Sequence, residues 1–204
     1  MLFRSAISST TGRITLSSSG VLDFETRRVY SLVVSVNNNG PSNATSLASV
    51  TINVKDQNEA PSLPATTALS VDENSAVGTV VGAVVGSDVD ASDAGKLRYS
   101  ITTADVPFTI NSTTGVITVS SATIDYETRG TWTVNARVTD SGWGGSTALT
   151  GDGSVVLTVV NKNDAPVLTD KTVSVDEGAA DLSITTVLAA DQDRKSTRLN
   201  SSHA

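Results

Sequence analysis

The sequence lacks the side chains on which several common kinds of site depend. Its 204 residues include no cysteine, which excludes a disulfide framework, a zinc–thiolate site and a cysteine nucleophile. The single histidine, His203, argues against a metal or catalytic site built on histidine. No apolar run reaches the roughly 18 residues that a membrane-spanning helix needs. Residues 1–12 lack the apolar segment of a signal peptide, so the targeting segment of a secreted parent protein is expected outside this chain.

Aromatic residues are also scarce, at 4%, although hydrophobic residues make up 38% of the chain. A packed core must therefore consist mainly of valine, isoleucine, leucine and alanine. Serine, threonine, valine, glycine and asparagine are abundant, and this composition is typical of strands and turns. The net charge of −7 argues against a nucleic-acid partner. It suits an extracellular protein or a protein that binds hard cations.

Four short motifs occur twice, in the same order and 102 to 105 residues apart. This periodicity predicts the back part of one repeat at 1–61, a complete repeat at 62–166 and the front of a third at 167–193. The boundaries fall at linkers that contain proline. The motif pairs are STTGRIT at 9–15 and STTGVIT at 112–118, LDFETR at 22–27 and IDYETR at 124–129, NEAP at 58–61 and NDAP at 163–166, and LSVDEN at 69–74 and VSVDEG at 173–178.

Residues 194–204, RKSTRLNSSHA, break this pattern. They carry three positive charges and no acid at the point where the third repeat should continue. They resemble a translated adapter sequence at the end of a truncated reading frame. We therefore predict that residues 194–204, including His203, are a non-native tail without a function.

Seven short segments of the complete repeat alternate between apolar and polar residues, or are apolar for a few residues between turns. In one of them, 131–140, the side chains of Trp132, Val134, Ala136 and Val138 are expected to face the core. Seven strands in about a hundred residues, with no helical period, predict an all-β fold, a β-sandwich of immunoglobulin-like type. The expected strands are 67–71, 78–86, 96–101, 107–110, 115–119, 131–140 and 154–161.

Acidic residues gather at the strand ends and linkers, whereas the strand interiors are nearly free of them. Clustered carboxylates repel one another unless a cation neutralises them. Ca²⁺ takes six to eight oxygen ligands from carboxylates, amide side chains and backbone carbonyls. Short spacings such as Asp88–x–Asp90 and Asp125–x–Glu127 suit it, because residues i and i+2 of an extended chain point the same way. Asp93 is instead interpreted as a solvated loop acid and Asp152 as a hairpin residue.

These motifs resemble the calcium motifs of the cadherin repeat family, and they occur in the family's order over about 190 residues. Glu73 matches the glutamate that ends the first strand, and Asp88 with Asp90 matches the D-x-D motif. Asp125 with Glu127 matches the family's D-R/Y-E motif, and Asp140 matches the aspartate that ends the sixth strand. DQNEAP at 56–61 matches the inter-repeat linker. The resemblance implies tandem Greek-key β-sandwiches joined by calcium sites.

Several residues depart from the family pattern. Both linkers are one residue short, Asn161 stands where an aspartate is expected, and Asn37 replaces the usual aspartate of the first repeat. The short linkers and the Ser/Thr/Asn/Ala-rich strands look more like the cadherin-like repeats of bacterial surface proteins than those of animal junctions.

The resemblance implies two shared calcium sites, one at each junction between repeats. The second site is expected to bind more weakly, because Asn161 is neutral and the third repeat stops early. The first junction would use Asp23, Glu25, Asp56, Asn58, Glu59, Asp88, Asp90 and Asp140. The second would use Glu73, Asp125, Glu127, Asn161, Asn163, Asp164, Asp191 and Asp193.

The function expected from this resemblance is that of non-enzymatic repeats in an extracellular or cell-surface adhesion protein. Calcium would stiffen the junctions, and the partners would be other cadherin-like repeats, as in homophilic cell adhesion, or cell-surface ligands. A passive spacer in a large secreted adhesin and a carbohydrate-binding module that uses Trp143 stay open as alternatives. A glycosidase with paired carboxylates would need a cleft with stacked aromatic rings, which three Phe, three Tyr and two Trp do not supply.

Overall fold

The computed structural model describes residues 5–16, 22–38, 40–41, 44–142, 146–168, 170–178, 189–191 and 193. Trp143 and the tail at 194–204 lie outside the described residues. Two compact units divide the chain. The first unit consists of residues 1–62, 87–97 and 139–151, and the second unit consists of residues 63–86, 98–138 and 152–204. The predicted repeat boundaries stay a prediction, because these units are defined by contacts and not by sequence similarity.

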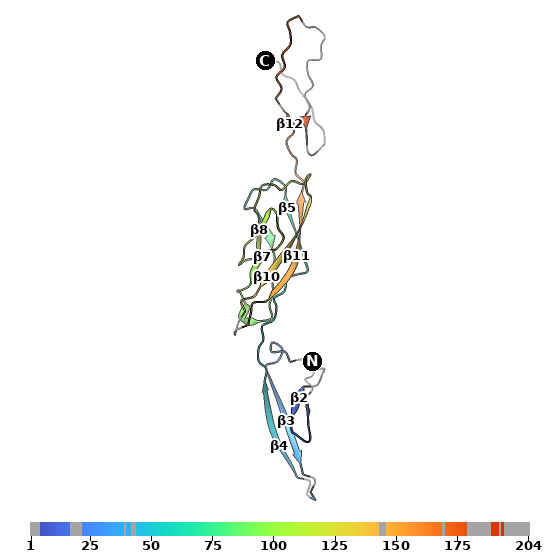
Figure 1. Ribbon diagram of the computed structural model, residues 1–204, viewed down its shortest axis with the longest axis vertical. Helices are drawn as coiled ribbons and strands as arrows, with labels where there is room; N and C mark the ends of the chain where they lie inside the picture. Colours follow the sequence, from blue (N-terminus) through green and yellow to red (C-terminus); the bar gives the residue numbers. More distant parts are fainter. Residues whose placement is uncertain are drawn as a thin grey trace. The chain divides into compact units, whose positions relative to one another are not determined.

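The second unit contains a β-sandwich (Figure 1). Seven strands form it, and two of them extend into residues of the first unit. One sheet has the strand order β5-β11-β10-β7, and the other has the order β6-β9-β8. All seven expected strands are present, and the all-β class is confirmed. The strands are β5 (Thr66–Asp72), β6 (Val80–Ala83), β7 (Arg98–Ile101), β8 (Phe108–Ile110), β9 (Val116–Val119), β10 (Thr131–Thr139) and β11 (Thr150–Val160).

The chain alternates between the two sheets from β5 to β8, and then β8 and β9 share one sheet while β10 and β11 share the other, in the manner of an immunoglobulin-like Greek key. The first strand, β5, pairs in parallel with the last strand, β11, and the register runs from Thr66 opposite Ser154 to Asp72 opposite Val160. In the second sheet, β9 pairs antiparallel with both β6 and β8.

The core of the sandwich consists of aliphatic side chains, as the scarcity of aromatics predicts. On β10, Val134, Ala136 and Val138 are buried, whereas the alternate residues face outward. Trp132 is half-buried on the same inward face, and its ring meets Phe108 edge to face with the centroids 6.1 Å apart. The predicted inward face of this strand is therefore confirmed.

Strand β11 begins four residues before its predicted start and so includes Asp152. The interpretation of Asp152 as a hairpin residue is wrong, because its carboxylate forms an ion pair with Arg137 of the adjacent β10 at 2.7 Å. The glycines around Asp152 suggest a turn, but they serve a close approach of two backbones. A Cβ on Gly151 would lie 2.0 Å from the carbonyl oxygen of Pro61.

The remaining described elements are short, apart from one long hairpin (Figure 1). In the first unit, β1 (Ser5–Ile7) pairs antiparallel with β2 (Ile14–Leu16), and β3 (Val29–Asn37) with β4 (Thr45–Asn53). The 3₁₀ helix η1 (Ala91–Asp93) also belongs to this unit. In the second unit, β12 (Val167–Leu168) pairs with β13 (Ala189–Ala190). No helix in the described part of the chain is long and apolar enough to cross a membrane.

The repeated STTG motifs form the same turn in both units. Gly12 donates its amide to the carbonyl oxygen of Ser8, and Gly115 donates to Asn111, each at 2.9 Å. Both glycines have a positive φ, and a Cβ on Gly115 would lie 2.3 Å from the Val84 carbonyl oxygen. The sequence repeat is thus a repeat of local structure as well.

The sandwich predicts a large penalty for a cavity at Leu157, whose side chain is 0% exposed. We expect Leu157→Ala to lower the free energy of unfolding by roughly 2–5 kcal/mol, since it removes buried methyl groups and leaves a void. The neighbouring exposed Thr158→Ala is the matched control, with a change within about 0.5 kcal/mol. Urea denaturation followed by circular dichroism measures both. If the two variants had equal urea midpoints, Leu157 would not be a core residue.

Candidate metal site

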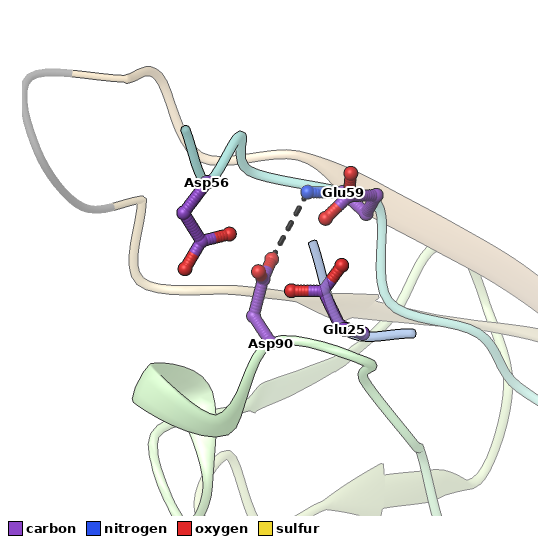
Figure 2. A group of neighbouring side chains, drawn as sticks. All are labelled: Glu25, Asp56, Glu59 and Asp90. Carbon is purple, nitrogen blue, oxygen red and sulfur yellow. Dashed lines mark hydrogen bonds between the residues drawn. The ribbon is translucent and has the colours of Figure 1, made fainter. Parts of the chain in front are cut away.

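Four acidic side chains converge in the first unit and form a group that we call the first cluster: Glu25, Asp56, Glu59 and Asp90 (Figure 2). One carboxylate oxygen from each lies within 4.8 Å of the others. Glu25 lies in the turn before β3, Asp56 and Glu59 lie in the linker after β4, and Asp90 directly precedes η1. Residues that the sequence assigns to two different repeats thus meet in one place.

Backbone amides hold the loops around the first cluster. The amide of Glu59 donates to Asp90 Oδ2 at 3.0 Å (Figure 2), and the amide of Asp90 donates to Asp88 Oδ1 at 3.0 Å. Asp140, which directly follows β10, accepts the side-chain amide of Asn58 at 2.9 Å. These contacts bring Asn58 and Glu59 of the linker together with Asp90 and Asp140, which are predicted ligands from the middle repeat.

Several oxygens around the first cluster are buried without a hydrogen-bond donor from the described residues. They are Asp56 Oδ1, Asn58 Oδ1, Asp88 Oδ2 and Asp90 Oδ1. An unpaired buried carboxylate or amide oxygen costs free energy unless something satisfies it. All four atoms are acceptors, so the group that would satisfy them is a hydrogen-bond donor or a cation. Carboxylate and amide oxygens are the ligand atoms that hard cations such as Ca²⁺ prefer.

Burial next to other negative charges changes the acidity of two carboxyls. Loss of hydration raises the pKa of Glu59, and the neighbouring charges of Glu25, Asp90 and Asp56 raise it further. Burial likewise raises the pKa of Asp88, although a hydrogen bond from the Asp90 amide opposes this effect. The protein alone therefore disfavours the ionised form of both groups, as expected of a site in which negative charges lack a counter-ion.

Two aspartates behave differently from the sequence-based interpretation. Asp93 is not a solvated loop acid: its side chain is 0% exposed, and it lies within 4.8 Å of Asp88 and Asp90. The turn of η1 brings it back toward Asp90, and the SDVDASD spacing alone does not indicate this. Asp23, a predicted ligand, lies outside the acidic groups that the described residues form. Its carboxylate instead accepts the amide and the hydroxyl of Thr26, each at 2.9 Å.

A second acidic group, the second cluster, lies in the second unit and contains Glu73, Asp125 and Glu127. Glu73 is buried, and its carboxylate accepts the backbone amides of Tyr126 at 2.9 Å and of Lys162. Asp125 accepts Thr128 through the same turn that Asp23 forms, and these hydrogen bonds lower its pKa. Three of the predicted ligands of the second junction are thus brought together.

Amide side chains supply donors around the second cluster. Asn161, which replaces an expected aspartate, donates to Glu127 Oε1 at 2.7 Å, and Asn74 donates to Asp164 Oδ1 at 2.7 Å. Asp193 accepts the Asp164 amide, and its own amide donates to Asp191. Asn163 donates its side-chain amide to the Asp164 carbonyl oxygen. Of the predicted ligands of this junction that the structure describes, only Asp193 retains a buried oxygen without a partner.

The middle repeat matches a known family. Residues 67–160 fit the family model described as Cadherin domain. The chain is 34% identical over 201 residues to Cadherin EGF LAG seven-pass G-type receptor 3 of Mus musculus. That match includes 94% of this chain but 6% of the relative, so the chain spans a small fraction of the relative's length.

Solved structures resemble the fold as well. Mouse Cadherin-23 EC22-24 superposes with a TM-score of 0.67 at 28% identity, covering 92% of this chain and 61% of that one. Protocadherin Gamma B2 extracellular cadherin domains 3-6 give a TM-score of 0.61 at 25% identity, covering 93% and 48%. The resemblance to bacterial surface repeats is not tested by these comparisons and stays a prediction. With the family match, the related sequence and the shared sandwich taken together, this chain belongs to the cadherin repeat family.

Proposed function

We propose that this chain is a calcium-binding segment of an extracellular, cell-surface adhesion protein, with a mechanical and not an enzymatic role. The observation that carries the proposal is the set of four buried acceptor oxygens around the first cluster, which no donor from the described residues satisfies. The extracellular setting is supported by Protocadherin Gamma B2, whose matching domains are described as extracellular.

The first junction would hold Ca²⁺ through residues that already converge. A bound Ca²⁺ would supply positive charge and six to eight coordination positions for oxygen. Glu25, Asp56, Glu59 and Asp90 offer carboxylates within 4.8 Å of one another. Asp88 and Asn58 add the other unpartnered oxygens. Asp23 and Asp140 are also proposed as ligands of this site. At the second junction, Glu73, Asp125 and Glu127 form the group to which Asn161, Asn163, Asp164, Asp191 and Asp193 would contribute.

The proposed mechanism is a change in the stiffness of the linker. Without a counter-ion, the carboxylates of Asp56, Glu59 and Asp90 repel one another, and the linker segment gains freedom to move away from Asp90. With their charge neutralised, the same groups stay together and hold the linker against the loop of the middle repeat. Stiff junctions would let tandem repeats present an adhesive surface at a distance from the cell.

The partner is proposed to be another cadherin-like repeat, and a passive spacer is the alternative. Sedimentation of the chain with calcium separates the two roles. Calcium-dependent self-association favours adhesion through these repeats, and a chain that stays monomeric at high concentration favours the spacer.

Replacing one charged ligand should weaken binding at the first junction. We expect Asp90→Asn to lower calcium affinity there by roughly tenfold or more, because affinity depends on the number of charged ligands. Asp105→Asn is the matched control, since Asp105 is an exposed acid in a loop outside both clusters. Isothermal titration calorimetry compares the two variants with the unmodified chain. Identical isotherms for all three would refute the assignment of Asp90.

Removing calcium should expose the linker without unfolding the sandwich. A ligand that binds only the ordered state stabilises it by about 2.7 kcal/mol at a hundredfold excess over Kd. Chelator should therefore lower the melting temperature and speed tryptic cleavage after Lys55, while the far-ultraviolet spectrum stays that of β-structure. Arg137, which lies within β10, serves as the internal control and should stay uncut. Unchanged cleavage after Lys55 would contradict a calcium-stiffened linker.

The second junction should gain calcium dependence from a single substitution. Asn161→Asp replaces the amide that donates to Glu127 with a carboxylate that repels it. We expect a lower melting temperature in chelator and a larger calcium-induced rise than in the unmodified chain. Differential scanning calorimetry at several calcium concentrations measures both. An unchanged melting temperature in chelator and an unchanged calcium-induced rise would show that residue 161 does not contribute to the site.

A further inference from the structure

Asp93 stands out among the acids of the first unit because its side chain is entirely buried. It is the last residue of η1, and its amide donates to the carbonyl oxygen of Asp90 at 3.0 Å. Its Oδ1 accepts the backbone amide of Ser141 at 3.0 Å and also the Ser141 hydroxyl. A buried carboxylate needs such donors, because leaving it unpaired would cost several kcal/mol.

Ser141 directly follows Asp140, a predicted ligand that is the first residue after β10. The Asp140 carboxylate is itself buried, and its orientation depends on the loop that follows it. Its Oδ1 accepts the amides of Gly142 and Leu149, each at 2.9 Å, and its Oδ2 accepts the side chain of Asn58 at 2.9 Å. Asp93 thus holds Ser141, the first residue of the loop whose amides orient the Asp140 carboxylate toward Asn58 of the linker.

The hydrogen bonds of Asp93 distinguish it from a ligand. The oxygens without a partner in this group belong to Asp88 and Asp90, whereas Asp93 Oδ1 already accepts two donors from Ser141. Its other oxygen, Oδ2, has the Ser92 hydroxyl at 3.5 Å. The loop that carries Asp90 and the loop that follows Asp140 are therefore connected through one carboxylate.

We propose that Asp93 is a positioning residue of the first junction: it joins the loop of Asp90 to the loop of Asp140 and does not bind calcium itself. This inference rests on the proposed calcium-binding function. Asp93 adds no oxygen to the ion but sets the mutual placement of two groups that do. Its effect on affinity should therefore depend on its shape and its acceptor oxygen, and not on its charge.

Three variants test this role by calorimetric calcium titration of the full chain. Asp93→Ala removes the acceptor and should weaken binding at the first junction by roughly tenfold or more, because it leaves the two donors of Ser141 without a partner. Asp93→Asn keeps an oxygen for Ser141 and should stay within about threefold of the unmodified chain. Ser141→Ala keeps the backbone donor and should fall between them. A ligand would give a different order, with Asp93→Asn as weak as Asp93→Ala and Ser141→Ala unaffected.

Amide hydrogen exchange in chelator supplies a readout that needs no metal. If Asp93 holds this loop, Asp93→Ala should speed exchange at Gly142 and Leu149, the two amides that bond Asp140, and Asp93→Asn should not. The exposed Asp105→Asn is again the control, and circular dichroism shows whether each variant is folded.

The two readouts separate the failure of this proposal from the failure of the calcium function. An unmodified chain that binds no calcium overturns the proposed function, and the exchange rates then still test whether Asp93 holds the loop. Unchanged affinity and unchanged exchange in Asp93→Ala overturn the positioning role alone. Equal loss of affinity in Asp93→Asn and Asp93→Ala also overturns it, because it makes Asp93 a ligand.

Discussion

The organisation of the first unit depends on an excess of acceptor oxygens over donors at one place. Glu25, Asp56, Glu59 and Asp90 bring four carboxylates within 4.8 Å of one another. Like charges at this distance repel strongly, and the repulsion grows as water is excluded. Loss of hydration raises the pKa values of Glu59 and Asp88, and the neighbouring carboxylates raise them further. The fold thus holds these carboxylates together against their mutual electrostatic repulsion.

Backbone amides provide the opposing constraint. The amides of Glu59, Gly142 and Leu149 donate to carboxylates of Asp90 and Asp140, so each acid is held by the chain rather than by an opposite charge. The second cluster differs in one respect, because amide side chains such as Asn161 already take part of the role of a cation. An exchange of aspartate for asparagine at equivalent positions of this fold therefore lowers the positive charge that the acidic group needs from a cation.

Much of this fold could be predicted from the sequence because strand alternation is a local signal. Trp132, Val134 and Ala136 face inward as their spacing indicates, and the repeated STTG and D-x-E-T-R motifs form equal turns. Tertiary partners are not local properties, and the interpretations of Asp93 and Asp152, which depend on such partners, were wrong. Asp93 looked like a loop acid because its donor, Ser141, lies 48 residues away. Asp152 looked like a turn residue because glycines flank it in the sequence. Those glycines instead allow a neighbouring backbone to approach the strand closely.

The candidate site could be predicted only in part, for a related reason. The motifs identify which residues are acidic and near a strand end, and the structure brings most of them together. They do not say which oxygens already have donors. Asp23 and Asp125 carry the same motif and accept the same threonine contacts, yet only Asp125 joins an acidic group among the described residues. That difference depends on neighbours contributed by other parts of the chain.

The parallel pairing of β5 with β11 has a mechanical consequence. Thr66 lies opposite Ser154 and Asp72 lies opposite Val160, so the chain enters the ladder at one end and leaves it at the other. A pulling force on both ends of this repeat would act along the two strands in opposite directions. It would load all the hydrogen bonds of the ladder in shear at once, whereas an antiparallel terminal pair would open like a zipper, one bond after another. This arrangement of first and last strands suits a domain that must carry tension along a tandem array.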